Sequence, residues 1–243
     1  MVVDSPAHYA TRLATDRDEV KAAQALRFEV FNVELNEGLE KSYATGLDED
    51  PFDPFCDHLI VEHLPSKQIV GTYRMQTGVN AAATLGYYSA QEFEFEVFER
   101  WRGEVVELGR ACVHLCHRNL VVLGLLWKGV ADYARDQKAR YLLGCSSITS
   151  QDPAAGASAY ADLCRHHLAS PEYRTRPRPD YECSLDFLAA EAPKIPKLLR
   201  AYLTIGAKIC GPPALDSEFK TIDFLTLLDL NALPEAVRQR FLS

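Results

Sequence analysis

The chain has 243 residues, 47% of them apolar, which is enough to bury a large hydrophobic core. With 34 acidic and 26 basic residues its net charge is −8, which argues against an extended nucleic-acid surface but allows a local basic patch. No window of 18 uncharged apolar residues suggests a membrane span, and the start, Met1–Pro6, does not resemble a signal peptide. Seven cysteines without a Cys-x-x-Cys pair then indicate reduced thiols and a cytoplasmic protein.

The N-terminal part predicts a strand over residues 9–13 and then a helix. Thr15 or Asp16 can cap that helix, and Glu19 is placed for a capping box. Its apolar side includes Arg27, which leaves two interpretations open. The arginine either extends its charged end to water or points it into a cleft.

Residues 36–55 have no clear periodicity and combine several carboxylates with aromatic side chains. A run of acids is usually a solvated loop. A long loop that also carries aromatics inside a compact domain is often a binding loop or a lid. Both interpretations remain possible for this segment.

The rest of the chain alternates strands and helices. Residues 57–62 and 68–76 predict a hairpin, with Arg74 inside its second strand. Further strands are expected over 105–113, 141–143, 208–210 and 221–230, and helices over 121–135, 154–168 and 194–203. Because no linker interrupts this order, the sequence predicts one α/β domain over residues 1–243.

The predicted strand 105–113 carries two charges, Glu107 and Arg110, in an apolar run. Residues three apart on a strand face opposite sides unless a bulge intervenes. Because an unpaired buried charge is costly, both groups need partners. The strand therefore belongs either to an ion-pair network that ties the sheet together or to the wall of a reactive cleft.

The motifs around these charges resemble two branches of the GNAT acyltransferase superfamily. One is the acyl-homoserine-lactone synthases, which the chain resembles at 26–31, 50–53, 71–74 and 107–110. The other, closer, resemblance is to the ornithine–acyl-carrier-protein N-acyltransferases that make lyso-ornithine lipid. Its motifs are Phe52-Asp53-Pro54-Phe55-Cys56-Asp57-His58-Leu59, Val70-Gly71-Thr72-Tyr73-Arg74, Glu107-Leu108-Gly109-Arg110, Leu125-Leu126-Trp127-Lys128-Gly129 and Gly206-Ala207-Lys208-Ile209-Cys210-Gly211-Pro212-Pro213-Ala214.

The resemblance implies a GNAT-like α/β fold with a mixed central sheet flanked by helices. It implies transfer of a fatty or 3-hydroxy-fatty acyl group from acyl carrier protein to an amino-acid α-amine, ornithine first. Glu107 is then the candidate base, with Arg110 beside it in the catalytic strand. The residues expected to position the acceptor and its loop are Arg27, Phe31, Asp50, Asp53 and Arg74. Neither a metal nor a bound cofactor is implied.

The turn after the central strand departs from the usual GNAT pattern. Ordinary members have glycines there, whose amides bind the coenzyme A pyrophosphate. This chain keeps Arg118 and Asn119 but has bulky residues in the glycine positions. A single phosphodiester needs less room, so the turn favours an acyl carrier protein as donor. Its docking surface is expected to use Lys128, Arg135, Lys138 and Arg140.

Other interpretations remain open beside this one. The acceptor is either ornithine, another amino acid, or S-adenosylmethionine as in lactone signal synthesis, and a non-catalytic carrier- or lipid-binding module is the alternative to an enzyme. The crowded spacing of Cys112, His114, Cys116 and His117 is poor for zinc, and Cys145 and Ser146 lack a nucleophile elbow. The basic amphipathic segment 194–203 predicts either peripheral contact with anionic lipid or a helix packed on the core.

Overall fold

The structure, a computed structural model, describes residues 6–191 and 193–241, so residues 1–5 of the segment examined for a signal peptide lie outside it. The described chain forms two compact units, residues 6–76, 108–138 and 241, and residues 77–107 and 139–240. Strand β4 (Val105–Val113) contributes its second half to the first unit and its beginning to the second. The single domain expected for the whole chain stays a prediction.

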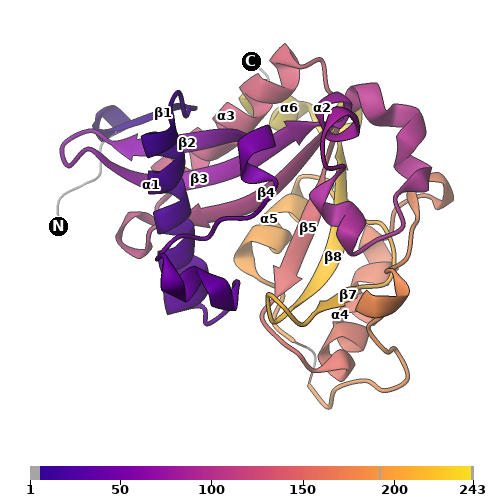
Figure 1. Ribbon diagram of the computed structural model, residues 1–243. Helices are drawn as coiled ribbons and strands as arrows, with labels where there is room; N and C mark the ends of the chain where they lie inside the picture. The colour runs from indigo at the N-terminus through magenta and orange to yellow at the C-terminus, as the bar shows by residue number, and fades with distance from the viewer. Residues whose placement is uncertain (1–5, 192, 242–243) are drawn as a thin grey trace. The chain divides into compact units, whose positions relative to one another are not determined.

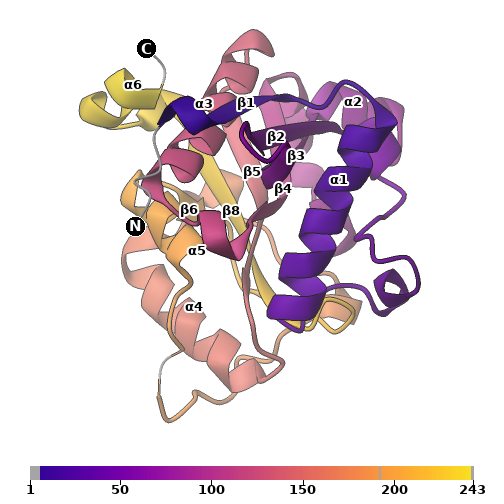
Figure 2. The same cartoon turned by 90° about the vertical axis from the view of Figure 1, so that its left-hand side faces the viewer.

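The first unit contains strands in the order β1-β2-β3-β4, of which β1, β2 and β3 pair antiparallel. Strand β1 (Tyr9–Leu13) pairs with β2 (Asp57–His63), and β2 pairs with β3 (Gln68–Thr77), with a register shift at Val61/Glu62. Helix α3 (Leu120–Asp136) packs along β1 and β2 (Figure 1, Figure 2). Gly129 permits this approach, because a Cβ there would lie 2.6 Å from Leu59 Cδ1.

Helix α1 (Arg17–Phe28) also belongs to the first unit, where it contacts β2. It begins as expected at Asp16, whose side chain accepts the N–H groups of Asp18 and Glu19. It continues into a π-helical turn, Glu29–Glu34, and then into the loop that precedes β2. That loop contains only short 3₁₀ turns, at Glu40–Ala44 and Asp53–Phe55.

The second unit contains a mixed sheet in the order β4-β5-β8-β6. Strand β4 runs parallel to β5 (Tyr141–Ile148) over Val105–Glu107 only, whereas β8 (Thr221–Asp229) is antiparallel to β5 along its whole length. Two short strands, β6 (Lys208–Ile209) and β7 (Ala214–Asp216), pair with β8. The helices are α2 (Gly78–Ala83), α4 (Pro153–His167), α5 (Lys197–Thr204) and α6 (Glu235–Phe241).

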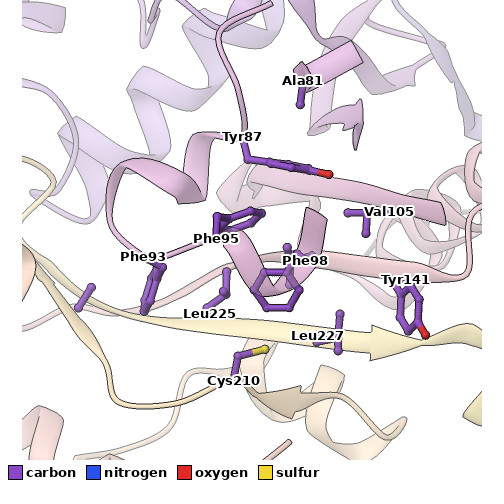
Figure 3. Close-up of a cluster of buried hydrophobic side chains, with 12 residues drawn as sticks. Ala81, Tyr87, Phe93, Phe95, Phe98, Val105, Tyr141, Cys210, Leu225 and Leu227 are labelled. Atoms are coloured by element: carbon purple, nitrogen blue, oxygen red, sulfur yellow. The ribbon is translucent and has the colours of Figure 1, made fainter. Parts of the chain in front are cut away.

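Aromatic side chains from residues 87–98, the segment before β4, fill one core of this unit. Figure 3 shows Tyr87, Phe93, Phe95 and Phe98 over Leu225 and Leu227 of β8. A second core cluster lies under α4 and α5 and includes Leu163, Leu199, Ile209 and Phe224. Burial of this apolar area is the main force that holds the segment before β4 against the sheet.

The α/β fold with a mixed sheet is confirmed, and most predicted strands are found within one to three residues of their expected ends. The strand expected over 141–143 is longer, to Ile148, and α2, α6 and β7 were not predicted. Helix α5 begins at Lys197 because Pro196 is extended (ψ 149°) and ends the preceding loop. No helix among the described residues is long and apolar enough to cross a membrane.

Candidate active site

Arg27 lies at the centre of a buried charge network in the first unit. Its guanidinium binds both carboxylate oxygens of Asp53, with Nη2–Oδ2 at 2.7 Å and Nη1–Oδ1 at 3.1 Å. Nε is 2.8 Å from Asp48 Oδ2, and Nη2 also donates to the Asp48 carbonyl. Since Arg27 is fully buried, the interpretation that it extends to water is wrong.

Two further arginines, Arg74 of β3 and Arg110 of β4, complete the network. Arg74 Nη1 lies 2.6 Å from Asp50 Oδ1 and 3.0 Å from Asp53 Oδ1. Arg110 lies 3.0 Å from Asp50 Oδ2 and 3.2 Å from Asp48 Oδ2. Three arginines therefore balance three aspartates in one cluster, as a buried ionic group requires.

Protonation of these groups follows from the same contacts. Burial raises the pKa of Asp53, but Arg27 and Arg74 lower it more, so the net shift is well below its usual range. The pKa of Asp50 is likewise lowered, by Arg74 and Arg110 against the effect of burial. Burial and Arg110 lower the pKa of Arg74, but Asp50 and Asp53 raise it by more, so the pKa is raised overall. Asp50 and Asp53 are therefore ionised at neutral pH.

This network anchors the acidic loop 36–55, so the solvated interpretation is wrong for its central carboxylates. Asp48 is fully buried, Asp53 is nearly so, and Gln24 of α1 donates a 2.9 Å hydrogen bond to Asp53. Asp48 was not among the predicted site residues, although it contacts both Arg27 and Arg110. The signal available in the sequence was its place in an Asp-x-Asp-x-x-Asp run.

Phe31 belongs to the π-helical turn Glu29–Glu34 that follows α1. It is partly buried against Leu26, Val30 and Cys112, in an apolar cluster of the first unit. Its ring therefore contributes to packing between α1 and β4. The predicted contact between Phe31 and the acceptor stays a prediction.

Arg110 has a left-handed backbone conformation, with φ at +50°. A residue with positive φ inside a strand is typical of a β-bulge, which changes the direction of the side chains that follow. Arg110 follows Glu107 by three positions on β4. In a regular strand two side chains at this spacing would face opposite sides, so a bulge is needed for both charges to face one side.

Glu107 is buried near the beginning of β4, with 4% of its surface exposed. Each carboxylate oxygen accepts one backbone N–H at 2.8 Å, Oε2 from Tyr88 and Oε1 from Ser89. The 3₁₀ turn Tyr88–Gln91 presents these two amides to the carboxylate group. The side chain is thereby fixed in one orientation.

A second cluster of titratable groups in the same unit was not predicted. Ligand atoms of Glu92, Cys145 and Asp223 lie within 4.8 Å of one another, the only such group of potential metal ligands in the described chain. Burial and the adjacent acids raise the pKa of all three groups. A thiol held protonated in this way is a poor nucleophile, which argues against covalent catalysis by Cys145.

The predicted donor-binding residues are placed as follows. Asn119 caps α3 by accepting the N–H groups of Val121 and Val122, and Arg118 is half-exposed and paired with Glu34. Lys128 and Arg135 of α3 both pair with Asp132, at 2.8 and 2.7 Å. Lys138 follows the helix, whereas Arg140 belongs to the second unit and binds Asp229 at 2.8 Å.

Three of the four residues considered for zinc have other partners, and the fourth, Cys116, is an exposed free cysteine. Cys112 is buried against Leu26 and Val30, and burial raises the pKa of its thiol well above the usual range. His114 lies 3.3 Å from Glu29, and His117 Nδ1 lies 3.0 Å from the Tyr9 hydroxyl. These contacts assign the three side chains to packing and surface pairing.

The chain is similar to known proteins over nearly its whole length. Residues 26–128 match the family model described as "Acetyltransferase (GNAT) domain". The L-ornithine N(alpha)-acyltransferase of Rhodobacter capsulatus is 33% identical, covering 97% of this chain and 95% of that protein. The enzyme of the same name from Brucella abortus is also 33% identical, covering 96% and 86%.

Two solved structures share the fold. FeeM, an N-acyl amino acid synthase from uncultured soil microbes, has a TM-score of 0.55 at 12% identity, covering 92% of this chain and 91% of FeeM. The acyl-homoserine-lactone synthase LasI has a TM-score of 0.53 at 11% identity, covering 96% and 94%. The GNAT-like fold expected from the motifs is therefore confirmed. The chain is an acyltransferase and belongs to the family of the L-ornithine N(alpha)-acyltransferases.

Proposed function

We propose that this acyltransferase moves a fatty acyl group, 3-hydroxylated or not, from the phosphopantetheine thioester of acyl carrier protein to the α-amine of L-ornithine. The observation that carries the proposal is the 33% identity, over almost the whole chain, to proteins named for ornithine Nα-acylation. The product would be lyso-ornithine lipid, so the enzyme would act in lipid biosynthesis. Its cytoplasmic location stays a prediction.

The chemistry is a direct transfer without a covalent enzyme intermediate. The neutral α-amine attacks the thioester carbonyl, an N–C bond forms, and the C–S bond breaks as the thiolate leaves. An α-amine has a pKa of about 8, so a base must accept its proton. Glu107 is that base, directly or through a water, and its proton passes on to the departing thiolate. Backbone amides of β4 after Arg110 would stabilise the oxyanion.

The charge network has a positioning role in this scheme. Its arginines and aspartates already neutralise one another, so they hold loop 36–55 against β3 and β4. The predicted contact of Asp50 or Asp53 with an amine of the acceptor stays a prediction, since their side chains are only 6% and 4% exposed. Direct substrate contact by Arg27, Asp53 or Arg74 would require one of these pairs to open.

The donor assignment is supported by the turn at the start of α3. Asn119 already occupies the N–H groups of Val121 and Val122, and no glycine precedes them. Few free backbone amides therefore remain at this turn for a pyrophosphate, and a single phosphodiester needs fewer of them. Arg118, now paired with Glu34, would exchange this partner for the phosphodiester of acyl carrier protein.

One reconstitution tests the reaction. The purified protein is incubated with acyl carrier protein or coenzyme A thioesters of one fatty acid and with single amino acids or S-adenosylmethionine. The expected product is Nα-acylornithine, identified by mass, with the carrier thioester preferred. Preferential acylation of another acceptor would overturn the ornithine assignment, and equal use of acyl-coenzyme A would overturn the carrier assignment.

Peripheral membrane contact is a separate part of the proposal, and its surface differs from the one expected. Leu199 and Leu203 of α5 are buried in the core, so the apolar side of this helix is not available to lipid. The loop before α5 exposes Phe187 (78%) and Leu188 (64%), and Lys194 and Lys197 follow it. Such a combination suits an anionic bilayer. Flotation with phosphatidylglycerol vesicles should be weakened by the double change Phe187→Ser, Leu188→Ser, and failure of the unchanged protein to float removes the contact.

A further inference from the structure

Glu92 and Asp223 are buried carboxyl groups that no lysine or arginine of the described chain neutralises. Glu92 is 2% exposed and Asp223 is 4% exposed. The charged groups that act on them are other acids, Asp216 among them, and Glu92 and Asp223 also hydrogen-bond each other, while the hydroxyl groups of Ser147 and Thr221 interact with Asp223. In the charge network of the first unit, by contrast, every aspartate faces an arginine. A buried carboxylate without a cation is costly, and such groups mark sites that receive a cationic ligand.

One oxygen of this pair also lacks a hydrogen bond. Asp223 Oδ1 is inaccessible to solvent and has no donor within hydrogen-bond distance. It belongs to a residue near the beginning of β8, where Asp223 pairs with Ala214 of β7 and Ser147 of β5. Neighbouring Asp216 is different, because its Oδ1 accepts the N–H groups of Glu218 and Phe219 and so closes a turn. The unsatisfied acceptor, Oδ1, therefore belongs to Asp223, and a donor from a bound ligand would complete it.

The pair is connected to the proposed base within the same unit. Ser89 donates its backbone N–H to Glu107 Oε1, and its hydroxyl accepts a 3.4 Å hydrogen bond from the Cys145 thiol. The same thiol lies 3.7 Å from Glu92 Oε2. One residue, Ser89, thus touches both the carboxylate that would accept the α-amine proton and the group beside the carboxyl pair.

We propose that Glu92 and Asp223 bind the side-chain ammonium of the acceptor and thereby select a diamino acid. The inference rests on the proposed function, in which the acceptor is ornithine. Ornithine has two amines at the ends of a four-carbon chain, about 6 Å apart when extended. With the side-chain ammonium held by the pair, the α-amine remains for Glu107. The ammonium supplies the donors that Asp223 Oδ1 lacks, and its charge lets the carboxyls ionise.

A divalent metal is the competing occupant, and it would need the thiolate form of Cys145. In the structure the thiol hydrogen is directed to the Ser89 hydroxyl or to Glu92 Oε2. An ammonium requires no deprotonation of sulfur.

The test compares L-ornithine with L-norvaline, which has the same carbon skeleton without the side-chain amine. Glu92→Gln and Asp223→Asn should each lower kcat/KM for ornithine at least tenfold and leave kcat/KM for norvaline unchanged or raised. Both changes remove a buried acid without loss of volume, so the variants should fold. The matched control is Glu94→Gln, two residues away and exposed in a pair with Arg176, and it should keep the unchanged protein's ratio.

Three other results have distinct meanings. If the unchanged protein acylates ornithine but both variants keep its preference over norvaline, the ammonium site is wrong and the proposed function stands. If the unchanged protein does not acylate ornithine, the proposed function fails instead. A stoichiometric metal in the purified protein that is lost from both variants would overturn the ammonium site in favour of a metal site.

Discussion

Arg27 of α1 and Asp53 of the following loop form a two-point ion pair, with Nη2–Oδ2 at 2.7 Å and both side chains almost completely buried. The pair joins a helix to a loop 26 residues away and is the contact through which the other charges of the network are organised. Because both ions have left water, removal of either leaves its partner uncompensated.

Arg27→Met should therefore lower the free energy of unfolding by about 3–5 kcal/mol. Urea unfolding followed by circular dichroism measures this change. The matched control is Arg165→Met, which removes an arginine from an exposed pair with Asp162 at 3.6 Å. The control should change stability by less than about 0.5 kcal/mol, and an equally small effect at Arg27 would contradict the assigned role of the network.

Asp223 should make the protein less stable as pH rises through the weakly acidic range. Burial raises the pKa of Asp223 to about 6 in the folded protein, from an ordinary value of 3.8. Between these values the unfolded chain ionises first, so its release of the proton favours unfolding. Asp223→Asn removes this effect. The free energy of unfolding of the variant, relative to that of the unchanged protein, should rise by on the order of 2 kcal/mol between pH 4 and pH 7. Thermal unfolding across that range measures the difference, and a constant difference would argue against the buried protonated acid.

Glu107→Gln should lower turnover by roughly a hundredfold or more, since an amide cannot accept the α-amine proton. The structure adds a second effect. The carboxylate accepts an N–H at each oxygen, whereas glutamine offers one oxygen and one NH₂ group. One amide, of Tyr88 or Ser89, then loses its acceptor, and stability should fall by about 1–3 kcal/mol.

Turnover at saturating substrates and melting temperature separate these two effects. Glu104→Gln, at an exposed position just before β4, is the control and should change neither. Nearly normal turnover in a folded Glu107→Gln protein would leave Glu107 a structural role only.

Asp132→Asn should strengthen binding of the acyl carrier protein. Asp132 neutralises both Lys128 and Arg135 on α3, so its removal frees two cations for an acidic partner. KM for the carrier should fall several-fold and Arg135→Glu should raise it, both with little change in kcat. The control is Asp162→Asn on α4, which should leave KM unaltered. If Asp132→Asn and Arg135→Glu act alike or not at all, the carrier docks elsewhere.

Two glycines of α3 should respond oppositely to alanine. A Cβ at Gly129 would lie 2.6 Å from Leu59 Cδ1, whereas a Cβ at Gly124 would meet nothing within 4 Å. Gly124→Ala should therefore stabilise the protein by up to about 1 kcal/mol, through helix propensity alone. Gly129→Ala should destabilise it by about 1–3 kcal/mol, because α3 must move away from β2. Paired denaturation curves decide this, and stabilisation by both changes would contradict the close packing.

The sequence alone determined the elements whose patterns are local. The alternation at 9–13, the cap at Asp16 and the apolar runs at 105–113 and 221–230 predicted β1, α1, β4 and β8. Short motifs around Arg74, Glu107 and Arg110 were sufficient to place the chain among the acyltransferases. These signals could be read because each depends on residues within a few positions of one another.

Only the tertiary structure decided which charges meet. Arg27 was ambiguous in sequence because its partners, Asp48 and Asp53, come from a loop without periodicity. The pairing of Glu92 with Asp223 was not visible in the sequence, since 131 positions separate the two residues. Helix α5 shows the same limit, because its amphipathic pattern fits a membrane and a core equally well, and burial of Leu199 and Leu203 chose the core. Charge pairing and burial depend on long-range contacts, which periodicity does not encode.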